Sequence, residues 1–329
     1  MYLAVMAVTL ALAGDTMLGR GVAERLAADP GHELLSAELV AIAREADLFV
    51  LNLECCISDR GEQVRDPERG FFFRAPPVAA ERLAEMGVAC VTIANNHVLD
   101  FGPDALHDTL THLEAAGIGA VGAGPDVDAA RTPVVLRGGG MSVRVVAATD
   151  HPYSYAARAD RPGTAFADLH QGVPEWLGER AAPGPDADAV IVAPHWGPNM
   201  RAQPVPHVRR AAAALEQAGA TLVVGHSAHV PQGPSGLILF DLGDFVDDYA
   251  VHPQLRNDLG LLWLVTLDAG GPLRIEAVPL RLEFAHTRRA SDVEATLLLA
   301  LLEERCAAAG SSVRREGERF VFGTGQVPG

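Results

Sequence analysis

The stretch Ala94-Asn95-Asn96-His97-Val98-Leu99-Asp100-Phe101-Gly102 decides how this chain folds. It follows the apolar, β-branched run Val88–Ile93, which predicts a buried strand. It precedes Pro103–Ala116, which predicts a helix with a proline in its first turn. Amide, imidazole and carboxylate side chains therefore lie at the carboxyl end of a strand, where open α/β sheets bind their ligands. We expect other strand-end loops to meet this one.

Outward from this stretch, strand-like and helix-like runs alternate along the chain. Such alternation is typical of crossover units around a buried sheet and predicts an α/β fold. The strand-like runs are Val5–Ala13, Leu48–Leu53, Ala89–Ala94, Val143–Ala148, Ala189–Ala193, Thr221–Val224 and Leu237–Asp241, and the helix-like runs are Ser36–Glu45, Pro77–Met86, Pro103–Ala116 and Pro206–Ala218.

The pattern changes after Gly260. Leu261–Leu267 and Leu273–Leu282 resemble paired strands, and a leucine-rich helix runs from Ser291 to about Ala308. No repeat or linker divides the sequence, so we expect a single domain over residues 1–329, with a core over about 5–270 and C-terminal strands and a helix over about 271–329 packed on it. Asp126–Gly140 and Arg158–Gly184 are predicted to be loops, and the tail from Gly310 is predicted to be peripheral.

Composition excludes several classes of function. The 329 residues are 49% hydrophobic, enough for a large core, and all 26 basic residues are arginine, which excludes Schiff-base chemistry by lysine. A net charge of −16 opposes binding to nucleic acid or to an anionic membrane.

The four cysteines form no CxxC pair, which favours a reduced, cytoplasmic protein. Met1–Ala13 has no basic region and is too short to span a bilayer, so we expect a core strand.

Polar side chains follow five of the predicted strands. These positions offer carboxylates, carboxamides and imidazoles, the mixture of ligands that suits Mn, Fe or Zn in a hydrolytic centre. His226 and His229 belong to one short loop, which lets both rings face the same point. The sequences at the strand ends are Gly14-Asp15-Thr16-Met17-Leu18-Gly19-Arg20, Asn52-Leu53-Glu54, Asn96-His97 with Asp100, His195-Trp196-Gly197, and Gly225-His226-Ser227-Ala228-His229.

Six motifs in this order, GDTMLGR, NLECCIS, ANNHVLDFG, HWG, GHSAHVPQG and FDLGDFVDDY, resemble the CapA family. That family is named for poly-γ-glutamate capsule synthesis and is related to calcineurin-like metallophosphoesterases. The resemblance implies a four-layer αββα sandwich with a centre for one or two divalent metal ions at its upper edge. It implies His97 as a general acid and Asp100 as the residue that orients it. The metal ligands that it implies are Asp15, Glu54, Asn96, His195, His226 and His229.

Two positions depart from the metallophosphoesterase pattern. Met17 stands where Asp-x-His would supply an imidazole, and a thioether cannot replace that ligand for a hard metal. The usual Gly-His-x-His ending is stretched by one residue between His226 and His229. The sequence is therefore compatible with one metal, a weakly held pair, or no metal.

The leading interpretation is a metal-dependent hydrolase, phosphoesterase-like, in which metal-activated water attacks a phosphate ester or a related acyl or amide bond and His97 protonates the leaving group. Arg20 would stabilise developing negative charge, and Asn52, Asp244 and Arg256 are candidates to bind a small-molecule or peptide substrate, expected to be anionic. One alternative is a peptide Cα epimerase that uses the same loops with little or no metal. Another is a non-catalytic ligand-binding relative. The sequence does not indicate the oligomeric state.

Each candidate also has an ordinary structural explanation. Asp15 could cap a helix, and each histidine could be a hydrogen-bonded core residue. One of Asn95 and Asn96 is expected to serve a turn. His107 and His112 are interpreted as structural, and Cys55 and Cys56 as small buried hydrophobes.

Overall fold

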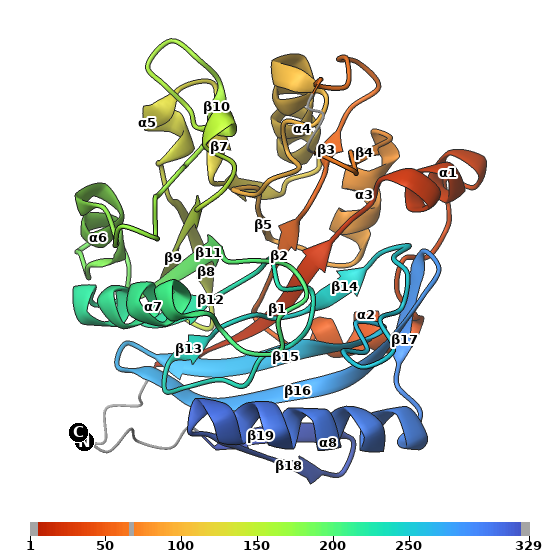
Figure 1. Cartoon of the computed structure of the whole chain (residues 1–329), viewed down its shortest axis with the longest axis vertical. Helices are drawn as coiled ribbons and strands as arrows, with labels where there is room; N and C mark the ends of the chain where they lie inside the picture. Colours follow the sequence, from red (N-terminus) through yellow and green to blue (C-terminus); the bar gives the residue numbers. More distant parts are fainter. Residues whose placement is uncertain (1–5, 66–68, 324–329) are drawn as a thin grey trace.

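The computed structural model describes residues 6–65 and 69–323. Two β-sheets face each other, and helices cover both outer sides (Figure 1). Residues 1–5, where the predicted first strand begins, lie outside the described residues, as do 66–68 and 324–329 at the end of the predicted tail. This is the α/β four-layer αββα sandwich that the family resemblance predicts.

The larger sheet is mixed and has β1 (Val8–Thr16) near its centre. On one side of β1 the strands are parallel, and on the other side β15 begins an antiparallel region. The order along the sheet is β18 (Ser312–Glu316), β19 (Arg319–Gly323), β16 (Gly271–Glu283), β15 (Leu259–Asp268), β1, β2 (Leu48–Leu53), β5 (Cys90–Thr92) and β6 (Gly119–Val121), while β14 (Asp244–Val246) pairs with β1 and β17 (His286–Arg289) with β16.

The smaller sheet has five strands, four of them parallel. Its fifth strand, β8, is antiparallel to β9 and forms one edge. The order is β13 (Ile238–Leu239), β12 (Leu222–Val224), β11 (Ala189–His195), β9 (Met141–Thr149) and β8 (Val134–Gly138).

Alternating side chains of β1 show how the layers pack. Leu10 and Leu12 point into a core shared by both sheets, while Ala11 and Ala13 face the core beneath the helices of the larger sheet. Those helices are α1 (Arg20–Ala28), α2 (Ala37–Ala43), α3 (Val78–Glu85) and α4 (Gly102–Ala115), whereas α6 (Glu175–Ala181) and α7 (Pro206–Ala218) cover the smaller sheet and α8 (Asp292–Ala309) covers the end of the core between the sheets.

Short elements fill segments for which the sequence predicts loops, so that prediction is wrong in part. The segment 126–140 contains α5 (Val127–Ala130) and β8, and 158–184 contains β10 (Gly163–Thr164) and α6. Partners elsewhere hold these elements in place: β8 pairs with β9 and β10 pairs with β7 (Ala123–Gly124). Two further two-residue strands, β3 (Cys56–Ile57) and β4 (Arg74–Ala75), pair beside α4, and a 3₁₀ turn spans Tyr153–Tyr155.

The tail after Gly310 is less peripheral than predicted. It forms β18 and β19, and Phe320 and Phe322 from β19 are buried in the core between the sheets. The ring of Phe322 lies 4.7 Å from that of Trp263. Within residues 6–65 and 69–323, no helix combines the length and apolar character needed to cross a membrane.

Two neighbouring leucines of α8 test this packing. Leu298 is fully buried in the core between the sheets, whereas Leu297 is 40% exposed. We expect Leu298→Ala to lower the free energy of unfolding in urea by about 2–5 kcal/mol, because it leaves a cavity. Leu297→Ala should change it by less than about 0.5 kcal/mol. Equal losses for the two variants would show that α8 does not pack in this orientation.

Candidate metal centre

Asp15 lies at the carboxyl end of β1, beyond Leu12, the last residue of β1 that pairs with β15. The last residues of β1 pair with β14 in parallel, which sets Asp15 beside Asp244. Gly14 permits this close approach, since a Cβ on it would lie 1.8 Å from the carbonyl oxygen of Gly243. Two acidic side chains that are distant in sequence are therefore fixed next to each other by backbone pairing.

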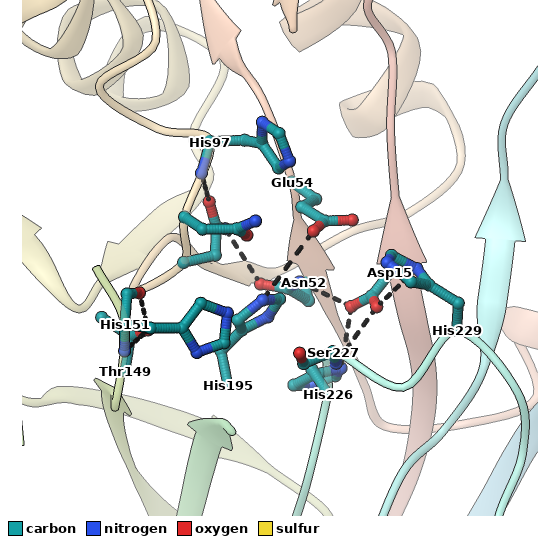
Figure 2. A network of polar contacts seen from close by, with 12 residues as sticks. Asp15, Asn52, Glu54, His97, Thr149, His151, His195, His226, Ser227 and His229 are labelled. Atoms are coloured by element: carbon teal, nitrogen blue, oxygen red, sulfur yellow. Dashed lines mark hydrogen bonds and ion pairs between the residues drawn. The ribbon is translucent and has the colours of Figure 1, made fainter. Parts of the chain in front are cut away.

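Hydrogen bonds from both sheets hold the carboxylate of Asp15 (Figure 2). The side-chain amide of Asn52, on β2, donates to Oδ1 at 2.7 Å, and the backbone N–H of Ser227, from the loop after β12, donates to Oδ2 at 3.2 Å. Asn52 in turn accepts from Thr92 and Asn95. Asn52 is thus a buried residue that orients Asp15, and its predicted contact with substrate does not follow from this position.

The loop after β12 turns two histidine rings toward Asp15. Nδ1 of His226 lies 3.6 Å from Oδ1 of Asp15, and Nδ1 of His229 lies 3.3 Å from Oδ2. Ser227 and His229 have φ angles of 106° and 60°, a conformation that costs roughly 1–3 kcal/mol for residues other than glycine. Asp241 stabilises this loop by accepting hydrogen bonds from the N–H groups of Ala228 and Gly243.

Two groups of three potential ligands share Asp15. One consists of Asp15, Glu54 and His195, and the other of Asp15, His229 and Asp244; within each, the ligand atoms lie within 4.8 Å of one another. A carboxylate common to two sets of ligands is the arrangement needed to bridge a pair of ions. Asp244, for which the sequence predicts substrate binding, belongs to this group and accepts from Nδ1 of His229 at 2.8 Å.

Several buried polar atoms in this region have no hydrogen-bond partner among the described residues. Such atoms are rare in proteins because burial without a partner costs free energy. A divalent cation fits this donor set, because oxygen and imidazole nitrogen are its ordinary ligands. The atoms are both carboxylate oxygens of Glu54, Oδ1 of Asn96, Nδ1 of His195, Nδ1 of His226, Oδ2 of Asp244 and Oδ2 of Asp247.

A third group of potential ligands, Asp150, His170 and His207, differs in this respect. Asp150 already accepts hydrogen bonds from His151, from the N–H of Gly197 and from His207. Both oxygens of this carboxylate have hydrogen-bond partners, so the unpartnered atoms single out the centre at Asp15.

Burial dominates the electrostatics of the centre. It raises the pKa of Glu54, and the charge of Asp15 raises it further. Burial likewise raises the pKa of Asp244, lowers that of His195 and lowers that of His226 to about 4. His229 differs, because the neighbouring carboxylates outweigh its burial and raise its pKa. Burial thus disfavours the carboxylate forms of Glu54 and Asp244, a cost that a bound cation would offset, and favours the neutral rings of His195 and His226, the form in which histidine binds a metal.

His97 lies beside the ligand groups and is oriented by Asp100. Nδ1 of His97 is 2.6 Å from Oδ2 of Asp100, and that carboxylate also receives the N–H of Phe73, the hydroxyl of Tyr155 and the guanidinium of Arg69. Burial lowers the pKa of His97, and Asp100 partly offsets this. Sequence reasoning missed Arg69 and Tyr155, because nothing in their spacing links them to His97.

Comparisons with known proteins show the family of the chain. The model of the bacterial capsule synthesis protein PGA_cap family matches residues 9–249. The chain belongs to this family. The match includes Asp15 and Asp244, so the two ends of the centre both lie within the matched region.

Curated relatives in the family include capsule and polymer synthesis proteins. A probable polyglutamine synthesis accessory protein of Mycobacterium tuberculosis is 32% identical over 90% of each chain. The capsule biosynthesis protein CapA of Bacillus anthracis is 26% identical over 84% of this chain and 67% of its own length. Among solved structures, a hypothetical protein of Thermus thermophilus aligns with 83% of this chain and 99% of its own, with 16% identity and a TM-score of 0.47.

Other predicted positions are less central than these. Met17 is fully buried in the apolar core beneath the helices, so this side chain supplies no donor to the centre. Asn95 makes the turn, since its Oδ1 accepts from the N–H groups of His97 and Val98. Arg256 pairs with Asp258 at 2.7 Å, and its contact with substrate stays a prediction. Arg20 pairs with Asp248 and lies above three aromatic rings.

Stability measurements test the unpartnered state of Glu54. At pH 7 without metal, Glu54→Gln should raise the free energy of unfolding by about 1–3 kcal/mol, because it removes a buried carboxylate that lacks a partner. The raised pKa of Glu54 means that the folded state favours the protonated form. The gain should therefore be absent below the ordinary glutamate pKa of about 4.3 and grow as the pH rises above it.

Urea unfolding with a chelator at several pH values measures this effect, with Glu24→Gln on the exposed part of α1 as the matched control. Added Mn²⁺ should stabilise the wild type more than Glu54→Gln. A loss of stability in Glu54→Gln at pH 7 without metal would contradict the assignment of an unpartnered carboxylate.

Proposed function

We propose that this chain is a metal-dependent hydrolase that acts on a phosphate ester or a related bond. The observation that carries the proposal is the sharing of Asp15 by two groups of ligands whose buried polar atoms lack partners. Asp15, Glu54, His195, His229 and Asp244 would hold one or two divalent ions such as Mn, Fe or Zn. Oδ1 of Asn96 and Nδ1 of His226, which have no hydrogen-bond partner among the described residues, would complete the donor set. When bound, the ions would polarise the substrate and lower the pKa of water.

His97 is the residue that moves a proton in this proposal. With Nδ1 directed at Asp100, its Nε2 is the nitrogen available to a leaving group. Burial keeps the resting ring neutral, and an anionic substrate beside it would raise its pKa and favour the protonated donor. Asp100, held by Phe73, Tyr155 and Arg69, fixes the ring in position.

The substrate in this proposal is a small molecule or a peptide, and the setting is the cytoplasm. The relatives are named for capsule and polymer synthesis. A net charge of −16 opposes a polyanionic polymer, a nucleic acid or an anionic membrane as the direct partner. We therefore propose that the reaction takes place at a single anionic group of the small molecule or peptide.

Kinetics of aryl phosphate hydrolysis test the role of His97. We expect turnover in Mn²⁺ that a chelator abolishes, and a decrease in kcat of about 10²- to 10⁴-fold in His97→Asn. The decrease should be smaller for a p-nitrophenyl ester, whose leaving group needs no proton, than for an alkyl ester. His107→Asn, on the exposed face of α4, is the control. Full activity in His97→Asn, or turnover that a chelator leaves unchanged, would contradict the mechanism.

A second candidate function is epimerisation at a peptide Cα. Two observations favour it: Met17 supplies no ligand, which weakens the metal centre, and His97 and His229 line the same pocket. Two bases in one pocket can remove a proton and return it to the opposite face. A non-catalytic binding role is disfavoured, because it would leave the convergence of the histidines unexplained.

Isotope exchange distinguishes this second candidate from hydrolysis. If the chain is an epimerase, incubation of a peptide panel with metal-free protein in deuterated water should place deuterium at Cα, and His97→Asn should slow the exchange. We expect no exchange if hydrolysis is the function. Mass spectrometry of the recovered peptides measures both outcomes.

A further inference from the structure

The candidate centre opens into a pocket of about 500 Å³ with an apolar wall. This volume lies within the range of small-molecule sites, roughly 300–1,000 Å³. His97 and His229 line the pocket and also border the centre, so a molecule in the pocket lies next to the proposed chemistry. We call its apolar wall the aromatic vestibule, formed by Phe71, Phe73, Met200, Tyr249 and Val251.

The rings of the vestibule are arranged around one another. Phe71 stacks with Phe73 at 6.5 Å between centroids and 20° between planes, and Phe73 lies 6.0 Å from Tyr249. Phe71 is 61% exposed and Val251 is 48% exposed, although both are large and apolar. Exposed apolar side chains gathered at the mouth of a pocket are typical of a binding surface.

Few fixed positive charges line the pocket. Among the described residues that line it, Arg20 is the one arginine. Its guanidinium pairs with Asp248, which also accepts from the N–H of Gly21, and it lies 5.2–5.4 Å from the centres of the Phe71, Phe73 and Tyr249 rings. Since the negative charge of Asp248 already compensates the positive charge of Arg20, the guanidinium mainly packs against the three rings and stabilises their arrangement.

We propose that the aromatic vestibule binds an aromatic group of the substrate, directly attached to the anionic group that reaches the candidate centre. Planar rings on the wall favour a planar partner through stacking and edge contacts. The one arginine among the described lining residues is already paired with Asp248, so the pocket gives a chain of anions few matching positive charges. The inference rests on the proposed hydrolase function for the identity of the reacting group.

Binding of two non-hydrolysable probes tests this inference. Phenylphosphonate and methylphosphonate carry the same anion and differ in the ring, so titration calorimetry in Mn²⁺ compares the vestibule directly. We expect phenylphosphonate to bind about tenfold more tightly. Phe71→Ala should reduce that ratio by about three- to tenfold. Leu273→Ala, which removes a side chain of similar exposure on β16, should leave the ratio unchanged.

The possible outcomes separate this inference from the proposed function. Equal affinities for the two probes, an unchanged ratio in Phe71→Ala, or displacement of phenylphosphonate by a pentaglutamate peptide at comparable concentration would each overturn the vestibule assignment. Preferential binding of phenylphosphonate that depends on Phe71 supports the vestibule even if no phosphate ester is hydrolysed, and that absence of turnover would count against the hydrolase alone. Hydrolysis that shows no preference for aryl esters over alkyl esters would support the hydrolase function and overturn the vestibule assignment.

Discussion

The carboxylate of Asp15 is the constraint on which the arrangement of the centre depends. It sits where β1 exchanges one neighbour for another, pairing with β15 over its first half and with β14 at its end. One of its oxygens receives a hydrogen bond from Asn52 in the larger sheet, and the other receives one from Ser227 in the loop of the smaller sheet. A single buried side chain therefore connects the two sheets at the edge where the loops gather. Glu54, His195, His229 and Asp244 each place a potential ligand atom within 4.8 Å of one from Asp15.

Gathering acidic groups at one buried place carries a cost in stability. Burial raises the pKa of Glu54, Asp241 and Asp244, and the backbone at Ser227 and His229 occupies a strained region. The extensive apolar cores on both faces of the larger sheet stabilise the fold enough to tolerate this. Strained backbone and several unpartnered polar atoms gathered around a few buried acids are typical of a functional site.

The sequence predicted those parts of the molecule that are determined locally. The long apolar runs became β1, β2, β9 and β11, and the capped leucine-rich segment became α8, because hydrophobic periodicity and helix caps act over a few residues. The segments that contain β8 and α6 are rich in glycine and proline and were therefore predicted to be loops. The stability of these two elements comes from the strands and helices that they contact. The ligand set came from motif resemblance. The roles of Arg69, Tyr155 and Asp241 were not predicted, because they arise from contacts made only in the folded chain.

The pairing of Asp15 with Asp244 also governs when the centre can form. These residues come from the first and third quarters of the chain, and their contact requires the intervening strands to be in place. During synthesis, a ribosome-bound chain that ends before β14 has no complete ligand set, however well its amino-terminal half has folded. If the centre binds metal as proposed, loading would therefore be a late event in biogenesis. It would report that the whole sandwich has assembled.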